Sequence, residues 1–216
     1  MVISASTSSG DKTWDGVSVT DELIVRLDKW LRAHRPDYYR WLLPGLTDFE
    51  YKKFEKRLGR QLPAAFRALY QWRNGQSDNC YKGFQDNRQF ASAESILHHK
   101  QVIDEVSQAG DFTMANWWHS TWVPFLDNGG GDAVCLDLTG VFTGCPGQLI
   151  KFWHDWEDRS VQYPSLLVWL DVFVGSLEMG LWADVGGDLH PVDEEAWARY
   201  RRRHSPGYPL RYEAGG

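Results

Sequence analysis

Three short runs of strand-forming residues, separated by glycine-containing turns, constrain the fold of this chain more than any other feature. They are residues 122–126, 133–138 and 148–154, in which β-branched, aromatic and other apolar side chains predominate. The turns between them are shorter than the crossover of a dozen or more residues that a parallel pair requires. The sequence therefore predicts one sheet in which these three strands are antiparallel neighbours.

Amphipathic helices are predicted before these strands in the sequence. Residues 19–34 carry apolar side chains at helical spacing, with Thr20 as the expected N-cap. Thr47 and Glu50 have the spacing of a capping box, and Gly59 is a natural C-terminal stop. The N-terminal third should therefore be helical.

The remaining segments complete an α+β pattern. Helices are predicted from Pro63 to Asn74-Gly75 and over residues 92–110, 166–177 and 194–203, with one or two helical turns at residues 38–43. Residues 76–91 are polar and lack periodicity, which favours a variable surface loop. We therefore expect helices packed on a central, mainly antiparallel β-sheet, with no internal repeat or linker.

Composition narrows the classes of partner. The 216 residues have a formal net charge of −6, so the average field repels nucleic acid and anionic membranes and favours a basic partner. The same charge is also what ordinary solubility requires. Twelve Trp, nine Tyr and ten Phe supply large side chains for a core or an interface, and composition alone leaves both uses open.

The cysteines and the N-terminus predict a cytoplasmic protein. Cys80, Cys135 and Cys145 are odd in number and form no CxxC pair, which favours a reducing compartment. Residues 1–10 lack the basic head and apolar run of a signal peptide, and no stretch approaches the roughly 20 consecutive apolar residues of a membrane span.

A triple-glycine turn at Asn128–Asp132 superficially resembles a phosphate-binding loop. A Walker loop needs Gly-Lys-Ser/Thr opening a helix, whereas these glycines lead into a predicted strand and are flanked by Asp127 and Asp132. The carboxylates would repel an anion, so we interpret the segment as a tight strand connection.

Metal and catalytic sites are not predicted. The candidate ligands are Asp127, Asp132, Asp137, His154, Asp155 and Asp158. Their spacing matches no standard metal site, and turn acids that cap backbone groups are the favoured interpretation. No nucleophile motif is present, and His98-His99 is expected on a solvated helix face, so we expect a non-enzyme without cofactor. A hydrolase whose catalytic residues meet only in the folded chain remains an alternative.

Three ordered motifs resemble a known superfamily. The first motif is Glu55–Tyr70 with its Leu62-Pro63 turn, followed by Asn74-Gly75. The second motif runs from Trp122-Val123-Pro124-Phe125 through Asp127 and Gly131-Asp132 to Leu136-Asp137. The third motif runs from Gly147-Gln148 through His154-Asp155 and Arg159 to Trp169-Leu170. Together they resemble the SUKH superfamily, which includes a yeast cell-wall-assembly regulator associated with killer-toxin resistance and many bacterial immunity proteins.

The resemblance implies one SUKH-like domain over residues 1–216, with a matched core of about 47–178 and extensions at 1–46 and 179–216. It implies a bacterial immunity protein that binds and neutralises a cognate secreted toxin, which could be a basic nuclease. The alternative is an intracellular regulatory or scaffolding module. The motif residues assigned to the scaffold are Leu62, Pro63, Asn74, Gly75, Trp122, Pro124, Phe125, Gly131 and Gly147.

The segment Trp153–Asp158 is the predicted toxin contact. It leaves a predicted strand and combines two tryptophans with three carboxylates, the composition expected of an aromatic anchor within an acidic rim. The partner-binding candidates are Trp153, Asp155, Trp156, Glu157, Asp158, Asp127 and Asp132, with Trp117 and Trp118 as further anchors if they are exposed. A core role for Trp153 and a merely solvating role for the acids remain open, as does the loop at residues 76–91 as the main contact.

Overall fold

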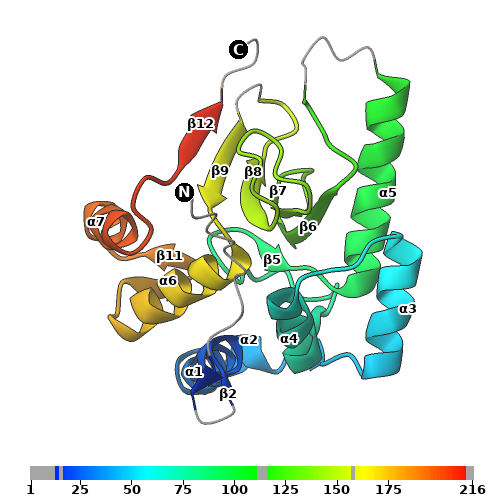
Figure 1. Cartoon of the computed structure of the whole chain (residues 1–216). Helices are drawn as coiled ribbons and strands as arrows, with labels where there is room; N and C mark the ends of the chain where they lie inside the picture. The colour runs from blue at the N-terminus through cyan, green and yellow to red at the C-terminus, as the bar shows by residue number, and fades with distance from the viewer. Residues whose placement is uncertain (1–12, 15–16, 111–115, 157–158, 213–216) are drawn as a thin grey trace, which may run out of the picture.

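A six-stranded antiparallel sheet lies at the centre of the computed structural model, which describes residues 13–14, 17–110, 116–156 and 159–212 (Figure 1). In spatial order the strands are β12 (Leu210–Tyr212), β9 (Arg159–Tyr163), β8 (Gln148–Phe152), β7 (Ala133–Asp137), β6 (Trp122–Asp127) and β5 (Gln89–Phe90). Each strand is antiparallel to its neighbours. The three strands expected from the sequence are therefore adjacent, and the predicted α+β fold is confirmed.

The helices begin and end close to the positions that the sequence signals indicate. They are α1 (Val19–His34), α2 (Pro36–Tyr39), α3 (Asp48–Leu58), α4 (Ala64–Trp72), α5 (Ala93–Ala109), α6 (Leu166–Glu178) and α7 (Glu194–His204). Thr47 and Glu50 form the expected capping box, and Gly59 ends α3 with a φ of 69°. The N-cap of α1 is Ser18, whose hydroxyl accepts from the Asp21 amide, because Thr20 already lies inside the helix and is buried.

The two faces of the sheet support separate hydrophobic clusters. Because side chains alternate along a strand, Leu149 of β8 joins one cluster and Ile150 joins the other. The larger cluster packs the sheet against α1, α4 and α6, which lie along one side of it, while α5 stands beside β6 (Figure 1). The smaller cluster covers the opposite face. Trp122, Phe125 and Leu136 are fully buried, as predicted, with Trp122 in the smaller cluster.

The Asn74-Gly75 pair does not end a helix, which corrects the sequence interpretation. It lies in β4 (Arg73–Gln76), which pairs with β3 (Leu42–Pro44), so residues 42–43 are also extended rather than helical. Gly75 has a φ of +70°, and a Cβ there would lie 2.5 Å from the backbone carbon of Ala91. The Asn74 side chain accepts from the Ala93 amide and so fixes the start of α5.

The segment of residues 76–91 is not the exposed polar loop that the sequence suggested. Phe84 and Phe90 are buried in the larger cluster. Gln85 is also buried, and its side chain accepts from the indole nitrogen of Trp169 at 2.9 Å. The side chain of Gln85 therefore satisfies a buried donor, which composition alone does not reveal, whereas Asp78, Asn79, Tyr81 and Asn87 of the same segment are exposed.

The two extensions pack against each other. Two short hairpins accompany the main sheet: β1 (Thr13–Trp14) with β2 (Val17–Ser18), and β10 (Trp182–Val185) with β11 (Asp188–Pro191). Arg35, which follows α1, is 3% exposed and donates to Asp184 Oδ2 at 2.8 Å and to the Gly187 carbonyl at 2.7 Å. Its side chain thus ties the N-terminal helices to the β10–β11 hairpin.

Two findings bear on the cellular setting. Within the described ranges, no helix combines the length and the apolar character needed to cross a membrane. The three cysteines are free, two of them buried and Cys145 exposed. A cytoplasmic, reducing location stays a prediction.

Candidate functional site

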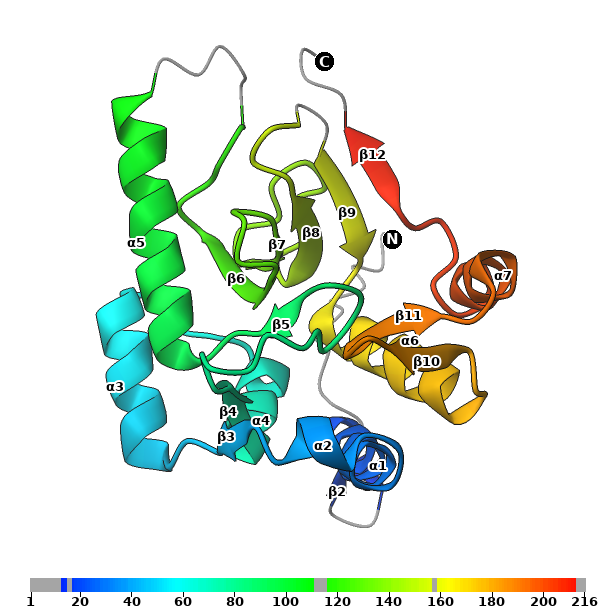
Figure 2. The same cartoon turned by 180° about the vertical axis from the view of Figure 1, so that it is seen from behind.

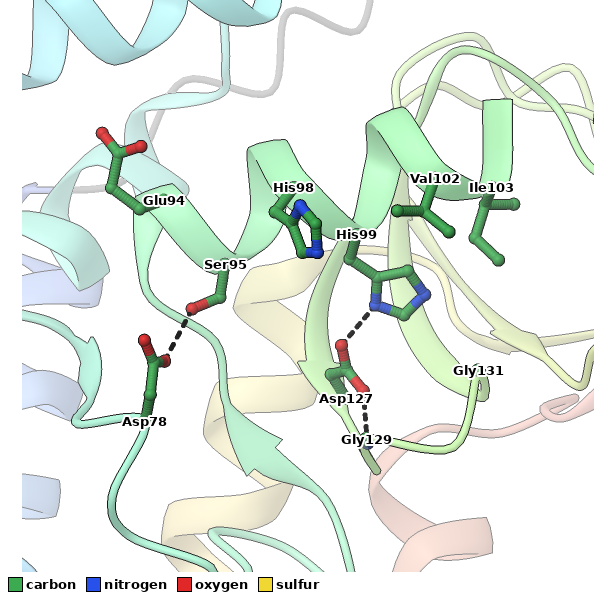
Figure 3. A pocket seen from close by; sticks show the side chains of 10 residues that line it. All are labelled: Asp78, Glu94, Ser95, His98, His99, Val102, Ile103, Asp127, Gly129 and Gly131. Atoms are coloured by element: carbon green, nitrogen blue, oxygen red, sulfur yellow. Dashed lines mark hydrogen bonds and ion pairs between the residues drawn. The ribbon is translucent and has the colours of Figure 1, made fainter. Parts of the chain in front are cut away.

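A cleft of about 590 Å³ opens between α5 and the turn that joins β6 to β7 (Figure 3). It is lined by Asp78, Glu94, Ser95, His98, His99, Val102, Ile103, Asp127, Gly129 and Gly131. Successive turns of α5 supply one wall, because residues three and four apart share a helix face. The glycine-rich turn supplies the other wall. Ionisable side chains and a short apolar strip thus share one concave surface.

His99 and Asp127 meet in this cleft. The ring nitrogen Nδ1 of His99 pairs with Asp127 Oδ2, while Asp127 Oδ1 accepts from the Gly129 amide at 2.6 Å. Burial raises the pKa of Asp127, but the bonds from His99 and Gly129 and the His99 charge outweigh it and hold that pKa below its usual value. The carboxylate is therefore ionised at neutral pH, which requires the proton on Nδ1 of His99. The side chain of His99 is mostly buried, which corrects the solvated position expected for it, whereas His98 is exposed.

The other ring nitrogen of His99, Nε2, is buried and has no hydrogen-bond partner among the described residues. A hydrolytic role would need a nucleophile beside this nitrogen. The hydroxyl of Ser95, which lines the same cleft, instead donates to Asp78 at 3.1 Å. The pair therefore lacks the arrangement of a catalytic triad in the part of the chain that the structure describes.

The turn between β6 and β7 is the tight connection that the sequence predicted. The Asn128 side chain accepts from the amides of Gly130 and Asp132 at 2.9 and 3.0 Å, so side-chain oxygens satisfy the turn backbone. Gly131 has a φ of 100°, and a Cβ there would lie 3.1 Å from Nδ1 of His154. The glycine thus lets the β6–β7 turn approach the segment that follows β8.

Asp132 and His154 join the two turns. Asp132 Oδ1 accepts from the His154 amide at 3.1 Å and lies 3.0 Å from its Nδ1. Ligand atoms of Asp132, His154 and Asp155 lie within 4.8 Å of one another, a grouping that could approach a cation. All three were among the candidate ligands named from the sequence, where their spacing matched no standard metal site. His154 and Asp155 are exposed, and Asp132 already pairs with His154. The same three residues can therefore hold the two turns together without a cation.

The tryptophans divide between surface and core. Trp156 is 56% exposed and packs edge-on against Trp153, with ring centroids 6.4 Å apart. Trp153 is only partly buried, and Nζ of Lys151 lies 3.7 Å from its ring centroid. Trp117 and Trp118 are buried in the smaller cluster, so they are not exposed anchors for a partner. Glu157 and Asp158 lie outside the described residues.

The carboxylates of the cleft and of the two neighbouring turns are together called the acidic face. They are Asp78, Glu94, Asp127, Asp132 and Asp155, and the exposed Trp156 follows Asp155 in the chain. Gly131 connects the two parts, since it lines the cleft and lies against His154. The structure therefore brings together three described acids predicted as partner-binding residues, Asp127, Asp132 and Asp155. Asp78 and Glu94, which line the cleft from other elements, were not among the residues predicted from the sequence.

Comparison with known proteins identifies the family of this chain. A relative from the yeast Debaryomyces hansenii, described as KNR4/SMI1 homolog 2, is 22% identical over 210 residues, which cover 74% of this chain and 36% of the relative. The chain thus spans about a third of the length of that protein. The family model of SMI1 / KNR4 (SUKH-1) matches residues 45–172, close to the core of 47–178 expected from the motifs. The chain therefore belongs to the SMI1 / KNR4 family (SUKH-1) within the SUKH superfamily.

Proposed function

We propose that this protein is a non-catalytic immunity protein that binds the basic surface of a cognate toxin through its acidic face. The observation that carries the proposal is the exposed Trp156 beside the clustered carboxylates of Asp132 and Asp155. An aromatic side chain surrounded by polar groups is the usual composition of a binding hot spot with its rim. Family membership supports a SUKH domain, and toxin neutralisation is the role that we assign to it.

The two kinds of side chain would contribute differently to binding. Carboxylates at a rim attract a basic partner over a distance, so they act mainly on the association rate and its salt dependence. Trp156 would bury its exposed ring against the toxin, and its loss would act mainly on dissociation. The proposal needs no catalytic group.

The test uses the secreted toxin encoded beside this gene, if the neighbourhood holds one, or one recovered by affinity capture and mass spectrometry. Trp156→Ala should weaken toxin binding by about 2 kcal/mol. Replacing Asp155, Glu157 and Asp158 together by Lys should slow association and abolish protection of cells that express the toxin. Surface plasmon resonance at two salt concentrations separates the two effects.

Matched controls lie on other elements. Phe49 of α3 is 78% exposed, so Phe49→Ala removes an aromatic side chain away from the acidic face. Glu195 of α7 is also exposed, so Glu195→Lys reverses a distant charge. Both controls should bind and protect like the wild type. Full affinity and protection in the folded Trp156→Ala and triple-Lys variants would reject the acidic face as the toxin contact.

A regulatory or scaffolding module is the second candidate. The observation in its favour is that the relative from Debaryomyces hansenii is much longer than this chain, so the shared region there is one part of a larger protein. Gene context separates the two proposals, because a neighbouring toxin or secretion gene favours immunity and a polysaccharide-synthesis context favours regulation. Affinity capture that repeatedly yields a housekeeping complex and no toxin would favour this candidate.

A further inference from the structure

A row of positive charge follows the outer side of α3. Residues 52–60 contain five lysines and arginines and one glutamate, in a chain whose formal net charge is −6. The inner side of the helix is marked by its buried residues, Tyr51, Phe54 and Leu58. α3 stands at the periphery of the molecule in both views, and its outer side is turned to solvent (Figure 2). The exposed residues on this side and just beyond the helix end are Phe49, Lys52, Lys53, Lys56 and Arg60.

Three of these cations line one groove, which we call the basic groove. This concave site of about 340 Å³ lies at the C-terminal end of α3 and is lined by Lys52, Glu55, Lys56, Gly59, Arg60 and Gln61. Lys52 and Lys56 are about one helical turn apart. The chain then turns at Gly59, whose φ is 69°, and Arg60 comes to line the same groove. Three positive side chains therefore share one concave surface.

The carboxylates near the basic groove are already held by other groups. Glu55, the acid in its lining, accepts from the Leu62 amide at 2.8 Å. At the start of α3, Asp48 pairs with Arg67, and Glu50 is held in the capping box. In the part of the chain that the structure describes, no ion pair within 4 Å joins a cation of the groove to a carboxylate. These cations therefore remain available to a partner.

Helix stability does not account for all of this charge. Positive side chains are favoured in the last turn of a helix, where the dipole is negative, and Lys56 and Arg57 lie there. Lys52 and Lys53 lie near the middle of α3, beyond the reach of that effect. Phe49, about two turns before Lys56, leaves its aromatic side chain 78% exposed. Exposed aromatic surface beside unpaired cations is a composition enriched at interfaces.

We propose that the basic groove and Phe49 bind an acidic peptide segment of a protein partner other than the toxin. Carboxylates of such a segment form charge-assisted hydrogen bonds with the lysines and the arginine of the groove, and an apolar side chain packs on Phe49. Along the helix axis, Phe49 and Lys56 are about 10 Å apart, which about three residues of an extended peptide cover. Arg57, at the neighbouring edge of α3, pairs with Glu94 of the acidic face and is not part of the groove.

The net charge of the molecule favours a short acidic segment over a long polyanion. Charges in solution interact over roughly 8 Å at physiological ionic strength. A short segment in the groove therefore meets mainly the local cations. A nucleic acid or an anionic membrane extends further and also meets the surrounding negative surface of the chain.

The experiment titrates the full-length protein with the peptide Phe-Glu-Glu-Glu-Glu, acetylated and amidated, and measures binding by isothermal titration calorimetry at low ionic strength. We expect saturable binding that weakens as salt is added. The peptide Phe-Gln-Gln-Gln-Gln keeps the ring without the charge and should bind about tenfold more weakly.

Variants at exposed positions then locate the site. Lys56→Gln should weaken binding of the glutamate peptide about fivefold, and Phe49→Ala about threefold. Lys29→Gln, at an exposed position of α1, is the matched control and should leave binding unchanged. Circular dichroism checks that each variant is folded. Equal binding of the two peptides by the wild type, or equal binding of the glutamate peptide by wild type and Lys56→Gln, would overturn the proposal.

Two further probes separate an acidic protein segment from other anionic partners. They are phosphatidylserine vesicles and a single-stranded oligonucleotide with the same charge as the glutamate peptide. Both should bind more weakly than the peptide, because neither places carboxylates in the groove and an apolar side chain on Phe49 together. Tighter binding of either probe would overturn the assignment of this surface to an acidic protein segment.

Discussion

Asp137, at the end of β7, shows how a single buried side chain can hold several turns together. It is fully buried and accepts from the amides of Thr139 and Gly140 and from the side chain of Gln148. Asp137→Ala should lower the free energy of unfolding by roughly 3 kcal/mol, because several buried donors would lose their acceptor. Urea denaturation measures this loss. Asp155→Ala, at an exposed position, should change stability by no more than about 0.5 kcal/mol.

An Asp137→Ala protein as stable as the Asp155→Ala control would show that water replaces the lost acceptor. The sequence marked Asp137 as a turn acid but could not distinguish it from Asp132, because burial depends on neighbours far along the chain. The same limit applies to His99, which lies 28 positions from Asp127 and was expected in solvent. Pairing between distant residues leaves no local signature.

Among the elements, β4 offers a direct test of why a glycine is required. Gly59 and Gly75 have nearly equal positive φ values, but only Gly75 has backbone atoms where a Cβ would stand. Gly59→Ala should therefore cost about 1 kcal/mol for the left-handed conformation alone. Gly75→Ala should cost roughly 3 kcal/mol or more, because β4 must also move away from Ala91 and Ser92. Thermal and urea unfolding compare the variants, and equal losses would contradict this explanation.

Elements that depend on local signals were predictable from the sequence. The capping box of Thr47 and Glu50 and the serine caps of α5 and α6 depend on residues within one helical turn. Strands β9 and β12 were missed, since each is defined by its partner across the sheet. Gly75 was misassigned for the same reason, because Asn-Gly is typical of a helix end and the close approach of Ala91 is a tertiary contact.

At the scale of the whole molecule, we predict one cooperative unit that includes both extensions. Leu27 and Leu31 of α1 are fully buried in the larger cluster, and Arg35 is held by the β10–β11 hairpin. A fragment of residues 47–178 would expose the faces of α4 and α6 that α1 covers, so it should not unfold cooperatively. Circular dichroism and tryptophan fluorescence should give coincident urea transitions for the full chain. A sharp transition in the fragment would show that the family core folds alone.

The position of α5 beside β6 has a consequence for self-association. β5 pairs with β6 only at Leu126 and Asp127, so the beginning of β6, from Trp122 to Pro124, lies at an open border of the sheet where α5 packs. An uncovered strand border of this composition can recruit a second chain, although Pro124 supplies no amide hydrogen for such pairing. Fibrillar assembly at high concentration should therefore begin when α5 detaches locally, well before the molecule as a whole unfolds.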